Sequence, residues 1–286
     1  MKIAAVVTLY HPGEETLANI ASYYNYVNKI FVFDNTEEGS SLKDNLCLQS
    51  KISFHHDGQN EGIAKRLNAA AIMAINEGYD WLLMMDQDSA FSTLMIENYL
   101  ECFKNYLPNN DVAMFGINYE QGEITPTSKC EALFSEELIT SGTLLNLSLF
   151  KAIGLFDENL FIDAVDNEYT IRTLLAGYKI IQFRNIQLKH QIGSLLKRAS
   201  IKTLFLIKKE KKVHSSLRCY YIYRNNLYIQ HKYKNTNVEY LKKLDVMVSS
   251  TIMRALYYGR NLRELIYYIS KAKKDFKNNR MGKLLK

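Results

Sequence analysis

The sequence predicts an α/β fold in which a mostly parallel β-sheet is flanked by helices, with a basic helical extension at its C-terminal end. Short runs rich in β-branched and aromatic residues alternate with helical patterns, and two of these runs end in acidic residues. Such alternation is typical of parallel sheets, because each crossover helix returns the chain to the end of the sheet at which the preceding strand began. A change near Leu195 to Lys- and Arg-rich helical patterns predicts two domains, residues 1–195 and residues 196–286.

The expected elements follow from the spacing of apolar residues, which differs between buried strands and amphipathic helices. The expected strands are Ile3–Leu9, Lys29–Phe33, Ile52–His55, Trp81–Met85, Val112–Ile117, Tyr178–Phe183 and Ile186–Lys189. The expected helices are Glu14–Tyr26, Gly62–Glu77, Thr93–Tyr106, Gly142–Phe150 and Val165–Leu175, with long helical patterns from Leu195 onward.

Composition and charge indicate an ordinary globular protein with two unlike halves. With 47% hydrophobic and 23% charged residues, the chain of 286 residues is neither disordered nor collagen-like. Residues 1–195 carry 13 Lys and Arg against 25 Asp and Glu, whereas residues 196–286 carry 23 against 5. We therefore expect the two halves to face different partners.

The cysteines and the apolar runs predict a cytoplasmic protein. Cys47, Cys102, Cys130 and Cys219 lie far apart without a C-x-x-C spacing. This pattern indicates neither a zinc site nor a disulfide framework, so we expect reduced thiols. The N-terminal segment lacks the features of a signal peptide, and no run of about 18 apolar residues predicts a transmembrane helix.

The most informative motif is Asp86-Gln87-Asp88-Ser89, directly behind a buried strand. Open α/β sheets bind ligands at the carboxyl edge of their strands, where these two carboxylates are expected. Carboxylate oxygens suit Mg²⁺ or Mn²⁺ held jointly with substrate phosphates. Acidic turns after strands are also common, so the motif alone leaves a structural role open.

Two more features are expected at the same edge. Asp34 can accept hydrogen bonds from a base or a ribose, or can form a strand-ending Asx turn. Gly62 permits close backbone approach, and Asn60 can cap a helix whose N-terminus would attract a phosphate. An ordinary capped helix is the alternative. No G-x-G-x-x-G or Walker loop is present, which disfavours dinucleotide and kinase-type sites.

The segment around Val165 places three acids between apolar residues, at Asp163, Asp166 and Glu168. A carboxylate there can act as a general base on a hydroxyl nucleophile, or can simply stabilise a helix N-terminus. His190 follows a strand-like run and can complete a metal site with its imidazole, or can be structural.

In their order along the chain, these motifs resemble the inverting family-two glycosyltransferases of the GT-A (Rossmann-like) type. Within that group the chain is most similar to bacterial rhamnosyltransferases of O-antigen and capsule assembly. The resemblance covers residues 3–195 and is carried by Thr8-Leu9-Tyr10-His11-Pro12, Phe33-Asp34-Asn35, Asn60-Glu61-Gly62-Ile63-Ala64 with Asn68, Asp86-Gln87-Asp88-Ser89, Ser141-Gly142, Gly154-Leu155-Phe156-Asp157-Glu158, residues 161–168, Arg172, Gly177 and His190, with Arg224-Asn225 beyond it. Two departures are Glu61, where relatives usually carry leucine, and Lys65-Arg66, which replace small residues.

The resemblance implies roles for individual residues. The implied donor-binding residues are Thr8, Tyr10, Asp34, Asn60, Gly62, Asn68, Asp86 and Gln87. Among them Asp34 would contact the base, and Asp86 would lie near the ribose and phosphates. Asp88 would bind Mn²⁺ or Mg²⁺, with Asp86 and His190 as further ligands. Asp166 would be the catalytic base, and Asp163, Glu168 and Arg172 would bind the acceptor sugar.

The function implied is inverting transfer of L-rhamnose from dTDP-rhamnose onto a lipid-diphosphate-linked or growing surface polysaccharide. Another donor, such as a UDP-hexose or UDP-galactofuranose, is an alternative. A nucleotidyltransferase using the same Asp pair and a non-catalytic nucleotide-sugar-binding module are further alternatives.

The basic C-terminal region combines aliphatic residues with Lys and Arg over Leu195–His214 and Tyr240–Phe276. Basic amphipathic helices of this kind lie on anionic membrane surfaces. We therefore expect a peripheral protein on the inner face of the cell membrane. Helices packed on the catalytic domain are the alternative, and the acidic first half argues against nucleic acid as a partner.

Overall fold

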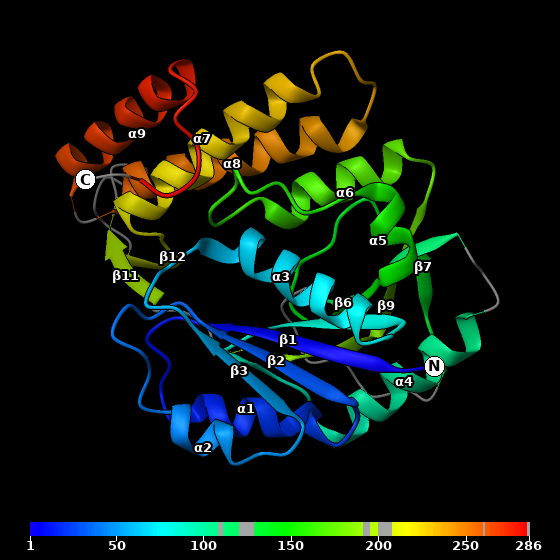
Figure 1. Cartoon of the computed structure of the whole chain (residues 1–286). Helices are drawn as coiled ribbons and strands as arrows, with labels where there is room; N and C mark the ends of the chain where they lie inside the picture. The colour runs from blue at the N-terminus through cyan, green and yellow to red at the C-terminus, as the bar shows by residue number, and fades with distance from the viewer. Residues whose placement is uncertain (108–110, 120–128, 191–194, 200–207, 260, 285–286) are drawn as a thin grey trace. The chain divides into compact units, whose positions relative to one another are not determined.

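A computed structural model describes residues 1–107, 111–119, 129–190, 195–199, 208–259 and 261–284 (Figure 1). The chain forms two compact units. Unit 1 comprises Met1–Asp157 and Tyr169–Gln191, and unit 2 comprises Glu158–Glu168 and Ile192–Lys286. The acidic segment 158–168 therefore packs with the C-terminal helices, although it lies well inside the first predicted range.

Unit 1 is built on an eight-stranded sheet with the order β3-β2-β1-β4-β8-β6-β9-β7. Neighbouring strands are parallel from β3 to β4 and between β6 and β9, while β8 and β7 pair antiparallel with their neighbours. The mostly parallel sheet is thus confirmed. Its strands are β1 (Ile3–Leu9), β2 (Lys29–Asp34), β3 (Ile52–His56), β4 (Trp81–Asp86), β6 (Val112–Asn118), β7 (Ala132–Phe134), β8 (Thr143–Asn146) and β9 (Lys179–Gln187).

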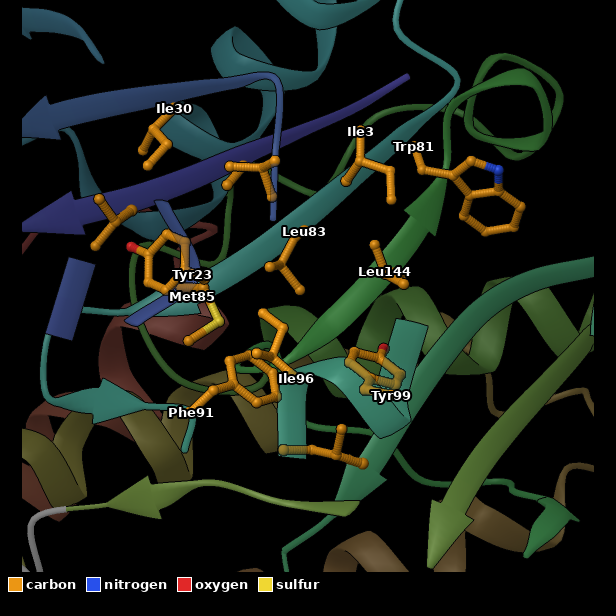
Figure 2. Packing of buried hydrophobic residues seen from close by; sticks show 14 of the residues in the cluster. Ile3, Tyr23, Ile30, Trp81, Leu83, Met85, Phe91, Ile96, Tyr99 and Leu144 are labelled. Atoms are coloured by element: carbon orange, nitrogen blue, oxygen red, sulfur yellow. The ribbon is translucent and has the colours of Figure 1, made fainter. Parts of the chain in front are cut away.

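Helices cover both faces of this sheet (Figure 1). Helix α3 contacts β1 and β4 on one face, and α1, α2 and α4 lie on the other. Ile3 of β1 lies in one buried hydrophobic cluster with Tyr23 of α1 and Ile96 of α4 (Figure 2), and Ala5 and Val7, the alternate residues of β1, belong to the same cluster. The helices are α1 (Glu15–Tyr24), α2 (Lys43–Cys47), α3 (Gly62–Asn76), α4 (Thr93–Tyr106), α5 (Leu147–Ile153) and α6 (Val165–Leu175), the last of which begins in unit 2.

Two predicted elements of unit 1 differ from the structure. The predicted helix Gly142–Phe150 begins as strand β8, and α5 starts only at Leu147, where the Asn146 side chain accepts from two backbone N–H groups. The two strands predicted over residues 178–189 are mainly one strand, β9. Short apolar runs do not distinguish a buried strand from a buried helix, which explains the first error.

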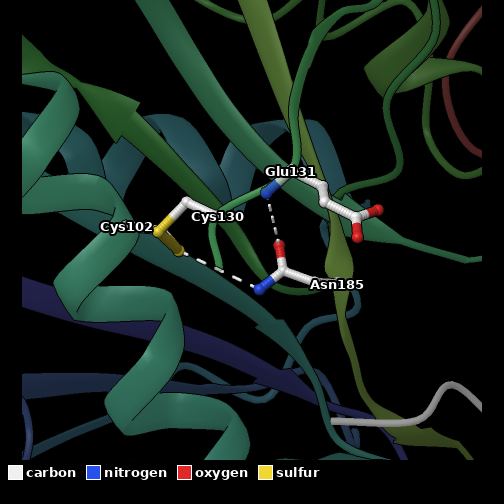
Figure 3. The surroundings of a disulfide bond; sticks show 4 residues. All are labelled: Cys102, Cys130, Glu131 and Asn185. Atoms are coloured by element: carbon white, nitrogen blue, oxygen red, sulfur yellow. Dashed lines mark hydrogen bonds between the residues drawn. A yellow bond between two sulfur atoms is a disulfide. The ribbon is translucent and has the colours of Figure 1, made fainter. Parts of the chain in front are cut away.

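Cys102 of α4 and Cys130 form a disulfide, with their Cα atoms 5.4 Å apart (Figure 3). Asn185 of β9 lies beside it and accepts a hydrogen bond from the Glu131 N–H at 3.1 Å. The prediction of four reduced thiols is therefore wrong for this pair, while Cys47 and Cys219 are free. Packing of α4 on β9 and pairing of β7 with β9 bring the two cysteines together, which their separation of 28 residues could not reveal.

Unit 2 consists mainly of α7 (Ser216–Lys232), α8 (Glu239–Tyr258) and α9 (Leu262–Lys277), and α7 contacts both other helices. The helical pattern predicted over Leu195–His214 is wrong where the structure describes it. Strands β11 (Leu195–Ala199) and β12 (Lys208–Lys212) form an antiparallel pair, and residues 200–207 lie outside the described residues. The segment of β12 has no apolar residue, so no apolar period could distinguish helix from strand there.

None of the helices in the described ranges has the length and hydropathy needed to cross a membrane.

Candidate active site

The carboxyl ends of β1, β2 and β4 meet at one edge of the sheet of unit 1. Thr8 of β1 is in register with Phe33 of β2 and with Asp86 of β4. The structure therefore brings Thr8, Asp34 and Asp86 together at this edge, as the strand pattern predicted. The Thr8 hydroxyl oxygen is buried and has no hydrogen-bond partner within the described residues. A bound ligand can satisfy such a group, because buried polar atoms are rarely left without a partner.

Asp34 ends β2 and is completely buried. Its two carboxylate oxygens accept hydrogen bonds from the backbone N–H of Thr36 at 2.9 Å and of Ser40 at 2.6 Å. The bond from the Thr36 N–H forms an Asx turn, the structural alternative to a ligand contact for this carboxylate. A carboxylate has about four acceptor sites, so these two bonds leave acceptor capacity for a ligand.

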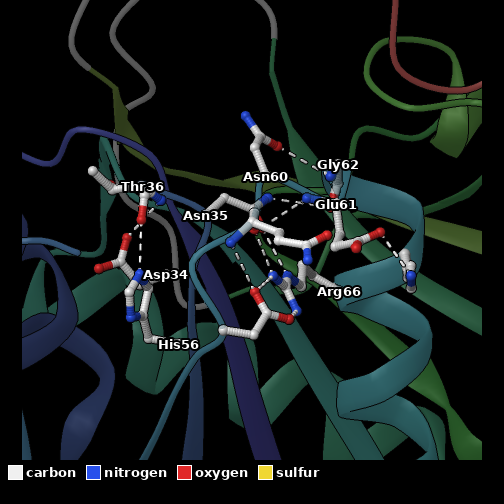
Figure 4. A network of polar contacts seen from close by, with 11 residues as sticks. Asp34, Asn35, Thr36, His56, Asn60, Glu61, Gly62 and Arg66 are labelled. Carbon is white, nitrogen blue, oxygen red and sulfur yellow. Dashed lines mark hydrogen bonds and ion pairs between the residues drawn. The ribbon is translucent and has the colours of Figure 1, made fainter. Parts of the chain in front are cut away.

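A polar network centred on Arg66 joins β2 to the loop before α3 (Figure 4). Arg66 donates through Nε to Asn35 Oδ1 at 2.7 Å and through both terminal nitrogens to Asp57, at 2.8 and 2.6 Å. It also donates to the Gln59 carbonyl at 2.8 Å, and its side chain is only 9% exposed. These hydrogen bonds hold the pKa of Asp57 at about 2. Arg66 is thus a buried side chain that holds this loop in place through hydrogen bonds. In the sequence this residue is distinctive only as a departure from relatives.

The loop ends in a tight turn at the start of α3. Gly62 has φ of 80°, a conformation that side chains disfavour, and its N–H donates to Asn60 Oδ1 at 3.1 Å. The residue preceding the helix, Glu61, makes no side-chain cap bond. Asn60 therefore closes the turn rather than capping at the N-cap position itself, and the N-terminus of α3 lies at the end of this loop.

Two side-chain amides predicted to bind the donor form hydrogen bonds with protein backbone. The Asn68 amide pairs with the backbone of Phe156, donating to its carbonyl at 3.0 Å and accepting from its N–H at 2.8 Å. The Gln87 amide pairs in the same way with the backbone of Tyr10, at 2.8 and 3.2 Å. Tyr10 is 47% exposed, and its ring lies 4.3 Å from that of His11. The Gln87 amide thus fixes the Tyr10 peptide, which directly follows β1 at the edge, and the Asn68 amide fixes the Phe156 peptide.

The Asp86-Gln87-Asp88 motif is anchored by its backbone. The Asp86 N–H donates to Ser141 Oγ at 3.1 Å, while the Asp86 side chain is exposed. Asp88 is half-buried and accepts from Ser89 Oγ at 3.5 Å. Strand β5 (Ser89–Ala90) then pairs antiparallel with β10 (Lys189–His190), which sets His190 opposite Ser89. The backbone therefore brings His190 beside the motif, although its side chain is outside the described residues.

The donor set suits a hard divalent cation. Within the described residues no three His, Cys, Asp or Glu side chains form a cluster that could hold a metal by themselves. Two neighbouring carboxylates fit Mg²⁺ or Mn²⁺, which are commonly held by one or two carboxylates together with substrate phosphates. The residues present therefore fit a metal that is completed by its substrate.

The acidic segment 158–168 of unit 2 contains two consecutive left-handed residues, Asp163 (φ 63°) and Ala164 (φ 65°). Such conformations cost free energy in residues with side chains and persist only where surrounding contacts hold them. Asn225 of α7 donates to the carbonyls of Ile162 and Asp163, at 2.8 and 2.9 Å. Arg218 of α7 forms a bidentate ion pair with the Asp163 carboxylate, with a shortest distance of 2.9 Å. The helix α7 thus holds the turn that leads into α6.

Asp166 and Glu168 both lie in the first turn of α6 but differ in environment. Asp166 is half-buried, and its Oδ1 accepts from the Asn167 N–H at 2.9 Å. Glu168 is completely buried and accepts from Lys232 Nζ at 2.8 Å and from the Tyr233 hydroxyl at 2.6 Å. Asp166 is therefore more accessible to a substrate than Glu168.

The third predicted acceptor residue, Arg172, lies in unit 1. It donates to the carbonyls of Ile153 and Leu155, at 3.1 and 2.7 Å, and so holds the end of α5. No sequence signal pointed to Lys232 or Arg218, whose partners lie more than 50 residues earlier in the chain. The Arg224-Asn225 pair did stand out in the sequence, but without a role.

A mostly parallel sheet with two carboxylates behind its fourth strand, next to a helix that begins at a glycine, is consistent with the GT-A fold, and the solved structures that the chain resembles share this fold. No protein-family profile matches the chain. The predicted resemblance to rhamnosyltransferases is confirmed by similarity to the dTDP-rhamnosyl transferase RfbF of Shigella flexneri. The two are 26% identical over 283 residues, which cover 93% of this chain and 91% of RfbF.

Solved structures share the fold at low sequence identity. The S. aureus TarS structure matches with a TM-score of 0.54 and 14% identity, over 91% of this chain and 44% of that one. TarS residues 1–349 in complex with UDP-GlcNAc match with a TM-score of 0.57 and 14% identity, over 96% and 80%. GalNAc-T7 with UDP, GalNAc and Mn²⁺ gives 0.61 and 14%, over 97% and 56%. The chain thus spans less than half of the full TarS chain, and these matches support the fold alone.

Proposed function

We propose that the protein transfers L-rhamnose from dTDP-rhamnose to a lipid-diphosphate-linked or growing surface polysaccharide, such as an O-antigen or a capsule. The observation that carries the donor assignment is the similarity to a dTDP-rhamnosyl transferase along nearly the whole of both chains. The geometry supports nucleotide-sugar binding, because Thr8, Asp34 and Asp86 share one sheet edge.

The donor binds at that edge in this proposal. Asp34 accepts a hydrogen bond from the base, the Thr8 hydroxyl gains its missing partner, and the N-terminus of α3 at Gly62 faces negative charge on the diphosphate. The nucleotide lies next to Tyr10 and Asn60. Asn68 and Gln87 act indirectly, because their side-chain amides hold the backbone of Phe156 and Tyr10. Asp86 and Asp88, with His190, would hold Mn²⁺ or Mg²⁺, which neutralises charge on the departing diphosphate when it is bound. One neighbour, GalNAc-T7, was solved with Mn²⁺.

Asp166 is the proposed general base. Its carboxylate accepts the proton of an acceptor hydroxyl while that oxygen forms a bond to the anomeric carbon. The bond from the anomeric carbon to the phosphate oxygen breaks in the same step, and dTDP leaves. A single displacement inverts the anomeric configuration. The acceptor-binding roles of Asp163, Glu168 and Arg172 stay predictions, and the protein contacts of these side chains support positioning.

The test is release of nucleoside diphosphate from a panel of dTDP-, UDP- and GDP-sugars, with Mn²⁺, with Mg²⁺ and with EDTA. We expect slow, metal-dependent hydrolysis of dTDP-rhamnose, abolished in Asp88→Asn. Turnover of a UDP-hexose or UDP-galactofuranose instead would reassign the donor. Release of pyrophosphate would indicate a nucleotidyltransferase, and tight donor binding without any product, even with a lipid-linked acceptor, would indicate a binding module.

A cytoplasmic protein bound peripherally to the inner face of the cell membrane would meet such an acceptor. The charge pattern of residues 196–286 supports this location, because cationic segments are attracted to anionic lipid surfaces.

A further inference from the structure

Helix α9 has a solvent-exposed face with apolar side chains in its first two turns and with basic side chains that lie mostly in its last two turns. Leu262, Ile266 and Tyr267 are 52%, 53% and 60% exposed. Arg263, Lys273, Lys274 and Lys277 are exposed as well. Spacings of four and seven residues link these positions, so they form two adjacent rows on one side of the helix (Leu262, Ile266, Lys273 and Lys277; Arg263, Tyr267 and Lys274).

This face carries no acidic residue. The two acids of α9 lie elsewhere on the helix: Asp275 is buried with Lys271 at 2.6 Å, and Glu264 accepts a hydrogen bond from Ser216 of α7 at 3.2 Å. Among the basic residues, Lys273 lies 5.8 Å from the ring of Tyr223. The charge of the exposed face is therefore uniformly positive.

The side of α9 opposite to this face packs against α7. Leu265 packs with Cys219, Ala272 packs with Tyr220 and Tyr221, and the Tyr220 hydroxyl donates to Asp275 at 2.9 Å. Because both ends of the helix are held in this way, the exposed face is presented as a fixed surface of unit 2. Figure 1 shows α9 running beside α7.

We propose that this face of α9 docks on an anionic phospholipid surface. A helix that lies in the membrane interface places apolar side chains at the acyl boundary and basic side chains among the headgroups. Leu262, Ile266 and Tyr267 supply the first part, and the four cations supply the second by charge complementarity. The biological purpose of this docking rests on the proposed function, because a lipid-linked acceptor would be reached at such a surface. The docking itself is argued only from the exposure and charge of α9.

The experiment is co-sedimentation of the full-length protein with vesicles of phosphatidylcholine alone or of phosphatidylcholine and phosphatidylglycerol. We expect binding to the anionic vesicles only. Lys273→Gln with Lys274→Gln should lower the partition about thirtyfold at low salt, because each cation near an anionic surface contributes about fivefold. Leu262→Ser with Ile266→Ser should lower it roughly tenfold or more at any salt concentration.

Matched controls are Leu48→Ser and Lys104→Gln, exposed positions of unit 1 that should leave the partition unchanged. Equal binding by the α9 variants and the wild type would overturn the proposal, as would equal binding to both vesicle types. Capture by single-stranded RNA without capture by anionic vesicles would also overturn it. Hydrolysis of dTDP-rhamnose in the absence of vesicles should be the same in all four variants. That readout separates a failure of docking from a failure of the proposed sugar transfer.

Discussion

The sheet edge of unit 1 and the acidic segment of unit 2 use their polar residues in different ways. At the edge, the side-chain amide of Gln87 forms hydrogen bonds with the Tyr10 backbone, and the Thr8 hydroxyl is buried without a partner in the described chain. In the acidic segment, carboxylates are paired with cations of α7. The comparison shows that a run of acids is not equivalent to a set of ligands, because the surroundings decide which carboxylate can meet a substrate.

The largest effect is expected from replacing Asp166, the residue of unit 2 that is proposed to act as the general base. Asp166→Asn removes the proposed base without changing its size, so kcat should fall by about 10² to 10⁴ while donor binding stays unchanged. The measurement is steady-state transfer together with dTDP-rhamnose binding, and Glu239→Gln, an exposed acid of the same unit, is the control. Wild-type kcat in Asp166→Asn would remove this residue from the mechanism.

A second substitution tests whether Glu168 is structural. Glu168→Ala leaves Lys232 and Tyr233 without their buried acceptor, and breaking such a pair costs roughly 2–4 kcal/mol of unfolding free energy. Urea unfolding measures this loss, and Glu168→Gln should lose less because it keeps an acceptor. Unchanged stability with a raised KM for the acceptor would instead place Glu168 in contact with the acceptor sugar.

Arg66 offers the corresponding test for unit 1. Arg66→Ala releases Asp57, Gln59 and Asn35, so we expect the loop before α3 to loosen and the KM for the donor to rise about tenfold, with a smaller change in kcat. Arg66→Lys should recover little, because an ammonium cannot form the two parallel bonds to Asp57. Lys65→Ala, one residue earlier and exposed, is the matched control. Equal losses of kcat and kcat/KM would argue against a positioning role.

The smallest effect concerns the pH dependence of unit 1. Hydrogen bonds from Arg66 lower the pKa of Asp57 to about 2, below its ordinary value of 3.8. A lowered pKa in the folded state means that the pair stabilises the protein above about pH 4 and loses this contribution as the pH falls toward 2. The Asp57 side chain is 51% exposed, so solvent weakens the pair. The difference in urea midpoint between wild type and Asp57→Asn should shrink over that range, whereas a constant difference would contradict the prediction.

The sequence predicted most of the elements of unit 1, because apolar runs that alternate with helical periods indicate a parallel sheet. It also predicted which residues end the strands, and hence that Asp34 and Asp86 lie at one edge. It could not predict their partners. Asn225 reaches the Asp163 carbonyl, and Lys232 reaches Glu168, from 62 and 64 residues away. Such contacts follow from the packing of α7, which no local pattern records. The Cys102–Cys130 disulfide escaped prediction for the same reason.

The division of the chain has a consequence for its synthesis on the ribosome. Unit 1 needs only residues 1–157 and 169–191, so its sheet can be completed while the C-terminal helices are still being made. Residues 158–168 emerge from the ribosome earlier than α7. Until α7 has been made, Asp163 lacks its ion-pair partner Arg218, and Glu168 lacks its partner Lys232. During that interval the left-handed turn at Asp163 lacks the hydrogen bonds and the ion pair that α7 supplies. The proposed catalytic base therefore takes its final place only after the sheet, late in the folding of the nascent chain.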